Sequence, residues 1–278
     1  MKILVIGASG MLAKPVIEHL DSKGFELRLF SRTVNPSMFV NDYDIVQGDV
    51  FNPDDLNKAV DGCDAIHISL SKLDEKKATE AILKVAMGNG IQLISLVSGC
   101  TVSEENRWFQ FIDNKFQAEQ MIMNSGIPYM IFRPTWFFES LEWMVRDGKA
   151  IMLGNQPNPY HWIAADDFAR LVADAFLKPE AKNKTFYLYG PELFLMKELL
   201  EKYCKAFYPE IKKVSVIPIP ILKLIALFTR NHELKEAAKL FGYFQKVKEP
   251  QISSEANDLP GKPKINFEKW LELKIEGS

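Results

Sequence analysis

The segment Gly7-Ala8-Ser9-Gly10-Met11-Leu12-Ala13 constrains the fold of this chain more than any other feature. It follows an apolar run over residues 2–6 and opens a helical pattern over residues 11–22. A glycine at position 7 permits a tight turn out of a strand. A glycine at position 10 lets the backbone approach a pyrophosphate at the helix N-terminus, where unpaired N–H groups favour an anion. The spacing predicts a nucleotide-binding strand–turn–helix unit, with a merely tight turn as the alternative.

Short β-branched runs alternate with helical patterns through the first two thirds of the 278 residues. This alternation predicts a parallel sheet with helices on both faces, and the right-handed crossover rule makes the sheet doubly wound. The expected strands are 2–6, 26–30, 44–47, 65–69, 92–97, 129–132 and 185–189, and the expected helices are 11–22, 53–60, 75–87, 114–124 and 166–177.

Helical patterns joined by proline-bearing loops dominate after about residue 191. We therefore expect a nucleotide-binding domain over 1–190, with segment 136–162 reaching into a second lobe, and a small, mainly helical, substrate-side lobe over 191–278. The longest apolar stretch, 214–228, is too short to span a bilayer and contains two prolines. We expect a helix there that packs on its own domain, with a membrane surface or a partner as the alternative.

Charge and cysteine usage exclude several classes of function. The net charge is −2, from 34 basic and 36 acidic side chains, so the chain lacks the electrostatic signature of a nucleic-acid-binding protein. Three scattered cysteines and four scattered histidines have neither disulfide nor metal-ligand spacing. We expect no metal, no membrane span, a cytoplasmic location, a small-molecule substrate, and a monomer or homodimer.

The end of the second expected strand, Ser31-Arg32, indicates which nicotinamide cofactor would bind. An acidic side chain there would bind the ribose hydroxyls of NAD and repel a 2′-phosphate, whereas a guanidinium can bind that phosphate with two hydrogen bonds. The sequence therefore predicts a preference for NADP over NAD. Lys14, on the first turn of the preceding helix, supplies a possible second cation. Either cation is alternatively a solvated surface side chain.

The glycine spacing resembles that of the NmrA-like and atypical extended short-chain dehydrogenase/reductases, which are NAD(P)-binding Rossmann proteins. Segments 47–50, 61–66, 126–129 and 133–137 are also similar, and the resemblance extends to about residue 200. It implies that the region of Asp49 flanks the adenine. The cofactor contacts that it implies are Gly7, Ser9, Gly10, Met11, Leu12, Asp49, Val50, Ser69, Lys115, Pro134 and Thr135.

Short-chain dehydrogenases also resemble one another in a Tyr-x-x-x-Lys pair, whose tyrosine is the acid and whose lysine holds the nicotinamide ribose. The lysine maps to Lys115, but the residue four positions earlier is Phe111, which has no ionisable proton. Ser98 lies near the position of the family's substrate-orienting serine, or in a plain turn. Lys115 and Ser98 are therefore the catalytic candidates, although Lys115 is alternatively a surface lysine.

Aromatic residues just beyond the sixth expected strand would suit a flat, apolar substrate pocket, or would seal the two lobes together. The pocket candidates are Phe111, Trp136, Phe137 and Phe138. The first functional hypothesis is an NADP-dependent reductase of a planar, activated substrate such as a quinone or enone, with lysine or water supplying the proton. The second is a catalytically silent NADP-binding redox sensor. The third is a sugar-nucleotide epimerase or dehydratase, which would need the absent tyrosine.

Overall fold

The computed structural model describes residues 1–70, 74–251 and 255–276, which form two compact units. Unit 1 contains Met1–Pro134, Ala165–Leu188 and the described part of Ile252–Pro263. Unit 2 contains Thr135–Ala164, Tyr189–Gln251 and the described part of Lys264–Ser278. Each unit has its own sheet structure and its own buried apolar residues.

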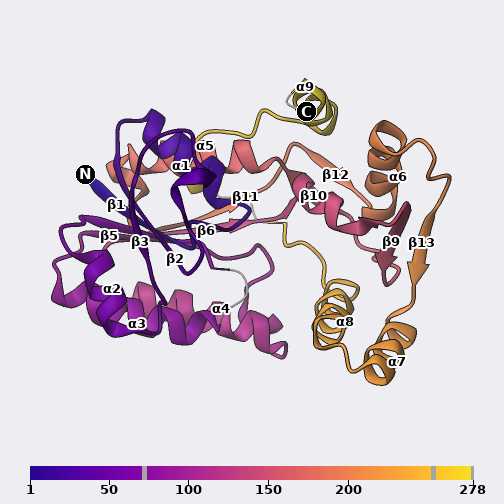
Figure 1. Cartoon of the computed structure of the whole chain (residues 1–278), viewed down its shortest axis with the longest axis horizontal. Coiled ribbons are helices and arrows are strands. Elements are labelled where there is room, and N and C mark those ends of the chain that lie inside the picture. The colour runs from indigo at the N-terminus through magenta and orange to yellow at the C-terminus, as the bar shows by residue number, and fades with distance from the viewer. Residues whose placement is uncertain (71–73, 252–254, 277–278) are drawn as a thin grey trace. The chain divides into compact units, whose positions relative to one another are not determined.

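Unit 1 is built on a seven-stranded parallel sheet in the order β11-β6-β5-β4-β1-β2-β3 (Figure 1). Strands β2 and β3 lie on one side of β1, and β4 and the strands that follow it in the chain lie on the other side. The strand order therefore reverses between β1 and β4. This confirms the doubly wound sheet. The strands are β1 (Lys2–Ile6), β2 (Glu26–Ser31), β3 (Asp44–Gln47), β4 (Ala65–Ile68), β5 (Leu93–Val97), β6 (Tyr129–Pro134) and β11 (Lys184–Leu188).

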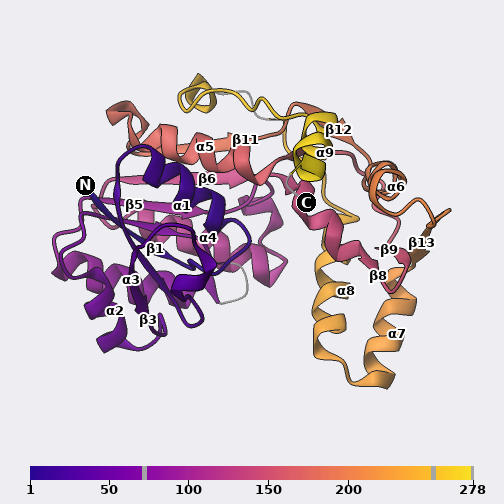
Figure 2. The ribbon, with the colours of Figure 1, turned by 45° about the horizontal axis from the view of Figure 1, so that its top comes forward.

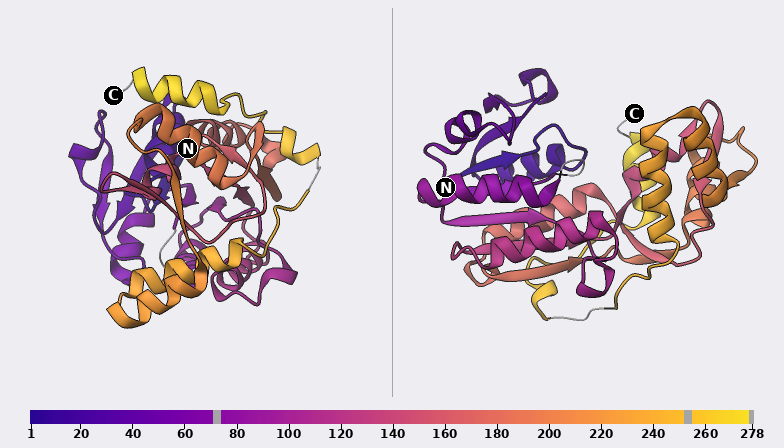
Figure 3. Two further views of the ribbon diagram at one scale, coloured as in Figure 1. Left: turned by 90° about the vertical axis from the view of Figure 1, so that its right-hand side faces the viewer. Right: turned by 90° about the horizontal axis from the view of Figure 1, so that it is seen from below.

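Helices cover both faces of this sheet: α1 and α5 lie on one face, and α2, α3 and α4 lie on the other (Figures 1 and 3). Apolar residues spaced three and four apart, such as Val16, Ile17 and Leu20, give α1 its buried stripe. The helical elements are α1 (Ala13–Ser22), α2 (Pro53–Val60), α3 (Glu75–Gly88), α4 (Gln110–Met123) and α5 (Ala165–Phe176), with 3-10 turns η1 (Pro36–Met38), η2 (Glu104–Asn106), η4 (Pro179–Ala181) and η5 (Glu255–Asp258).

Two helix starts differ from the predictions by more than one residue. Helix α1 begins at Ala13 instead of residue 11, because the glycine turn extends through Leu12. Helix α4 begins at Gln110 instead of residue 114. The earlier start places Phe111 and Lys115 on one helix, one turn apart.

Unit 2 contains the predicted helices and, in addition, short strands in two three-stranded sheets, β12-β10-β7 and β13-β9-β8. Its core is aromatic, and Phe138 packs against Phe267 and Trp270 with ring centroids 5.4 Å away in each case. The elements are β7 (Trp136–Phe137), η3 (Phe138–Met144), β8 (Val145–Arg146), β9 (Lys149–Leu153), β10 (Tyr160–Ile163), β12 (Glu192–Phe194), α6 (Met196–Phe207), β13 (Val214–Ile217), α7 (Ile219–Thr229), α8 (His232–Phe244) and α9 (Phe267–Glu276).

Helices α7 and α8 pack side by side as a hairpin (Figure 2). One face of α7 is buried through Ile219, Leu222 and Ala226, as expected for a helix that packs on its own domain. The opposite face is also apolar, and Leu227 and Phe228 on it are exposed. No helix in the described ranges is long and apolar enough to cross a membrane.

Candidate functional site

The glycine turn joins β1 to α1 at the carboxyl edge of the sheet in unit 1. Gly7 has a φ of +89°, and a Cβ there would lie 2.1 Å from the carbonyl oxygen of Ser69, so the fold itself requires glycine. Gly10 differs, because a Cβ there would approach only the Gly7 carbonyl oxygen, at 3.2 Å. Gly10 is exposed. Glycine at position 10 therefore keeps an outward-facing surface flat instead of relieving a crowded one.

Backbone donors are left over on this surface. Within the turn, Gly10 N–H donates to the Gly7 carbonyl oxygen at 2.9 Å. In the described residues, the N–H groups of Ser9, Met11 and Leu12 have no hydrogen-bond partner, and α1 has no side-chain cap. Unpaired N–H groups at a helix N-terminus form an anion site, so the turn fits the pyrophosphate of a dinucleotide.

Three hydroxyl groups gather between this turn and the end of β2. Ser31 donates to the Ser9 hydroxyl oxygen at 3.0 Å, and Thr33 approaches the same oxygen at 2.9 Å. Arg32 lies between Ser31 and Thr33 in the chain and is exposed, with no ion pair or hydrogen bond in the part of the chain that the structure describes. Lys14 is 3.9 Å from Glu18, and both side chains are exposed. Sequence reasoning missed Thr33, although its position directly after Arg32 was a usable signal.

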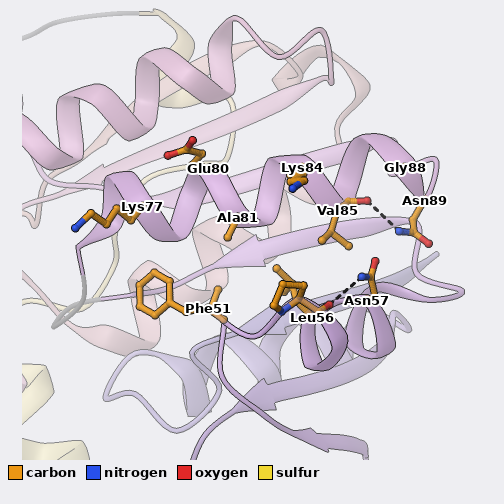
Figure 4. A pocket seen from close by; sticks show the side chains of 12 residues that line it. Phe51, Leu56, Asn57, Lys77, Glu80, Ala81, Lys84, Val85, Gly88 and Asn89 are labelled. Atoms are coloured by element: carbon orange, nitrogen blue, oxygen red, sulfur yellow. Dashed lines mark hydrogen bonds between the residues drawn. The ribbon is translucent and has the colours of Figure 1, made fainter.

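The segment after β3 is tightly packed. A Cβ on Gly48 would lie 2.7 Å from the Cβ of Asp55, whose carboxylate accepts the Asp49 N–H at 3.0 Å. Val50 is buried. Beyond it, a groove of about 430 Å³ runs between α2 and α3, and Figure 4 shows Phe51 and Lys77 toward one end of the labelled side chains and Asn89 at the other.

Lys115 lies in a buried ion pair. Its Nζ donates to Glu75 Oε1 at 2.5 Å and lies 5.3 Å from the centre of the Phe111 ring. Both charged side chains are almost fully buried, and the second Glu75 oxygen, Oε2, is buried without a partner in the described residues. Burial raises the pKa of the Glu75 carboxyl, against the opposing effect of the Lys115 ammonium. Sequence reasoning missed Glu75, because it lies 40 residues from Lys115 in the chain.

Ser98 belongs to a different polar network. Its hydroxyl donates to Glu119, a fully buried carboxylate that also accepts two hydrogen bonds from Arg133. Arg133 in turn donates to the Tyr187 hydroxyl. The structure therefore does not pair Ser98 with Lys115, and this network ties β5, α4, β6 and β11 together.

The remaining predicted residues fall in both units. Ser69 and Pro134 are in unit 1, where Ser69 N–H donates to Ile6 at 3.0 Å and the Pro134 carbonyl accepts from Cys100 at 2.9 Å. Thr135 is in unit 2, and its hydroxyl donates to the His161 carbonyl at 2.6 Å. In the ranges described, no group of three metal-ligating side chains occurs.

The aromatic candidates of unit 2 have different environments. Trp136 is half-buried, stacks on Trp162 with ring centroids 5.6 Å apart, and lines an apolar cavity of about 480 Å³. Phe137 is buried, and Phe138 is fully buried in the core.

Comparisons with known proteins agree with this geometry. Residues 7–179 match the model of a family described as NAD(P)H-binding. The photosystem II assembly factor Ycf39 of Trieres chinensis is 25% identical over 300 aligned positions, which cover 100% of this chain and 89% of the relative.

Two solved structures share the fold. A nucleoside-diphosphate-sugar epimerase from Staphylococcus aureus has a TM-score of 0.78 at 20% identity, covering 98% of this chain and 100% of its own. The triphenylmethane reductase of a Citrobacter species, complexed with NADP(H), has a TM-score of 0.78 at 18% identity, covering 98% and 99%.

Proposed function

Because this chain belongs to the NAD(P)H-binding family, we propose that it is an NADP-dependent reductase of a small, planar, activated acceptor such as a quinone or an enone. The family match confirms the resemblance drawn from the glycine spacing. The observation that carries the proposal is the contact of Lys115 Nζ with the Phe111 ring. The chain has the lysine of the Tyr-x-x-x-Lys pair, but Phe111 stands in place of the tyrosine and has no hydroxyl proton to donate.

The residues of unit 1 provide the parts that NADP needs. The N–H groups of Ser9, Met11 and Leu12 bind the pyrophosphate, and Arg32 binds the 2′-phosphate beside the hydroxyls of Ser31 and Thr33. Bound NADPH supplies a hydride.

The rest of the cofactor site follows from the resemblance. Asp49 and Val50 flank the adenine, and Ser69 and Pro134 contact the nicotinamide half. The ammonium of Lys115 has three N–H groups, and one donates to Glu75. The others donate to the nicotinamide ribose. Ser98 acts indirectly, because its hydroxyl donates to the Glu119 carboxylate and so positions it.

The absence of a hydroxyl group on Phe111 restricts which acceptors the protein can reduce. A simple ketone that receives a hydride becomes an alkoxide, and a positioned general acid contributes about 10²–10⁴-fold to that step. A quinone or enone spreads the developing charge over several atoms and needs less help. The shared fold of a reductase of triphenylmethanes that binds NADP(H) supports an acceptor of this delocalised type. We also propose a cytoplasmic location, because all three cysteines are buried as thiols.

Steady-state oxidation of NADPH tests the proposal. Wild-type protein should reduce quinones or enones and leave simple ketones and alcohols unchanged. Phe111→Tyr restores a hydroxyl one helical turn from Lys115, so it should introduce weak ketone reduction while changing quinone reduction less than about twofold. Efficient ketone turnover by the wild type would contradict the assignment of Phe111.

A catalytically silent NADP-binding sensor is the second candidate function. The full-length similarity to a protein named as an assembly factor favours it, since that name describes no reaction. Tight NADPH binding without oxidation by any activated acceptor would support this candidate and exclude the reductase. An epimerase, the third candidate, would need the hydroxyl that Phe111 lacks, although the fold is shared with one.

A further inference from the structure

Glu75 on α3 and Glu119 on α4 are both buried carboxylates, but they differ in how completely the protein satisfies them. Glu119 accepts hydrogen bonds on both oxygens, from Ser98 and from Arg133. Glu75 accepts from Lys115 Nζ on Oε1 at 2.5 Å, whereas its Oε2 is buried with no hydrogen-bond partner in the described residues. A buried acceptor without a donor is costly and rare, so Oε2 of Glu75 calls for a donor from outside the protein.

The position of Glu75 in the fold indicates where that donor comes from. Glu75 lies on the first turn of α3, directly after Asp74, whose side chain caps the helix. Helix α3 follows β4, so its first turn lies at the carboxyl edge of the sheet, next to the point where the strand order reverses between β1 and β4. Dinucleotides bind to doubly wound sheets outside this edge and at this point.

The ion pair lies just beneath the surface of unit 1. The Lys115 side chain is 9% exposed and the Glu75 side chain is 3% exposed. The Phe111 ring, with its centre 5.3 Å from Lys115 Nζ, contributes an apolar neighbour and no donor. Because the two oxygens of a carboxylate share one carbon atom, a ligand that reaches Lys115 from the surface also comes close to Oε2 of Glu75.

A sugar diol has the hydrogen-bonding groups that this ion pair leaves unsatisfied. Lys115 uses one of its three N–H groups on Glu75, so it still needs acceptors, whereas Oε2 of Glu75 needs a donor. A hydroxyl group can both accept and donate, so a ribose can accept from Lys115 and donate to Glu75. A phosphate would meet the Glu75 carboxylate as a like charge, which excludes it from this position.

We propose that Glu75 is a cofactor-binding residue, whose Oε2 accepts a hydrogen bond from a hydroxyl of the nicotinamide ribose while Lys115 donates to the same ribose. This inference rests on the proposed NADP site of unit 1, and every residue that it uses belongs to that unit. Glu75 holds the ammonium of Lys115 through Oε1 and orients the ribose through Oε2. The buried carboxylate is thereby satisfied on both oxygens when the cofactor binds.

Isothermal titration calorimetry with two fragments of the cofactor tests this assignment. The fragment 2′-phospho-ADP-ribose contains the second ribose, and 2′-phospho-ADP lacks it. Glu75→Gln keeps one oxygen for Lys115 but loses the charge and the second acceptor. It should weaken binding of NADPH and of 2′-phospho-ADP-ribose about tenfold, and change binding of 2′-phospho-ADP less than about twofold. Glu80→Gln is the matched control, because Glu80 is an exposed glutamate on the same helix, and it should leave all these affinities unchanged.

The outcomes separate this inference from the proposed function. Wild-type protein that binds neither the fragments nor NADPH would overturn both. If wild-type protein binds them and Glu75→Gln weakens both fragments equally, or weakens neither, the NADP site stands and the assignment of Glu75 is wrong.

A second measurement needs no variant and decides the question if Glu75→Gln proves unfolded by circular dichroism. In a crystal structure of the wild-type protein with 2′-phospho-ADP-ribose, a Glu75 oxygen should lie within about 3.2 Å of a ribose hydroxyl. A Glu75 carboxylate that contacts only Lys115 in that complex would contradict the proposal.

Discussion

At the scale of single residues, the site depends on contacts between side chains that are distant in the sequence. Gly10 and Arg32 could be selected from the sequence, because their proposed roles depend on a local turn and on the end of one strand. Glu75 could not, since its contact with Lys115 spans 40 residues. A sequence pattern carries no local signal for such a contact.

The first residue-scale prediction concerns the choice of cofactor. Arg32→Ala should weaken NADPH binding about ten- to a hundredfold, because a hydrogen bond to a charged group contributes roughly 1.5–3 kcal/mol. NADH binding should hardly change, since NADH has no 2′-phosphate. Fluorescence titration with both reduced cofactors measures this, and Lys14→Ala, whose side chain is also exposed, should have the smaller effect. Equal weakening for both cofactors in Arg32→Ala would show that Arg32 does not bind the phosphate.

At the scale of elements, long periodic segments were predicted well and short ones were not. The strands of unit 1 and the helices α2 and α3 match their predicted positions closely, because their apolar spacing repeats over several residues. Strands β7 and β8 are two residues long each and are defined by their pairing with β10 and β9. A segment of two residues is too short to show a periodic sequence pattern. The start of helix α4 was predicted four residues late, at residue 114 instead of Gln110.

The pairing of β4 with β5 makes an element-scale prediction about pH. His67 on β4 lies opposite Ser95 on β5, with Nδ1 2.6 Å from the serine hydroxyl, and the ring is fully buried. Burial lowers the pKa of His67 from 6.5 to about 4. The folded protein therefore binds this proton less readily than the unfolded chain, so the contribution is fully present above pH 6.5 and is lost as the pH falls toward 4.

At about 1.4 kcal/mol per pH unit, His67 should reduce the free energy of unfolding by about 2 kcal/mol between pH 6.5 and pH 5. Urea unfolding at the two pH values measures the loss. His67→Asn removes the titrating group, so this part of the pH dependence should disappear while the part due to carboxylates remains. Identical pH dependence in the two proteins would mean that His67 does not titrate as its burial requires.

At the scale of the whole molecule, the doubly wound sheet of unit 1 was predictable from the sequence. The secondary structure of unit 2 was predictable only for its helices. Alternating strand and helix patterns predict a doubly wound parallel sheet, because few topologies satisfy the crossover rule. The sheets of unit 2 pair strands from segments before and after α5, which are separated in the sequence. The proposed nucleotide site lies on the predictable part of the molecule.

Titration of the folded Gly10→Val variant with NADPH tests the central claim, that the turn between β1 and α1 binds the cofactor. A Cβ at position 10 would meet only the Gly7 carbonyl oxygen, at 3.2 Å, so the turn must shift slightly, and the thermal unfolding midpoint should fall without loss of the fold. The branched side chain would occupy the space of the pyrophosphate, and binding should be lost. Gly88→Val on α3, where a Cβ meets nothing within 4 Å, should bind NADPH normally. Wild-type affinity in a folded Gly10→Val protein would contradict the account, because the nucleotide would then bind elsewhere.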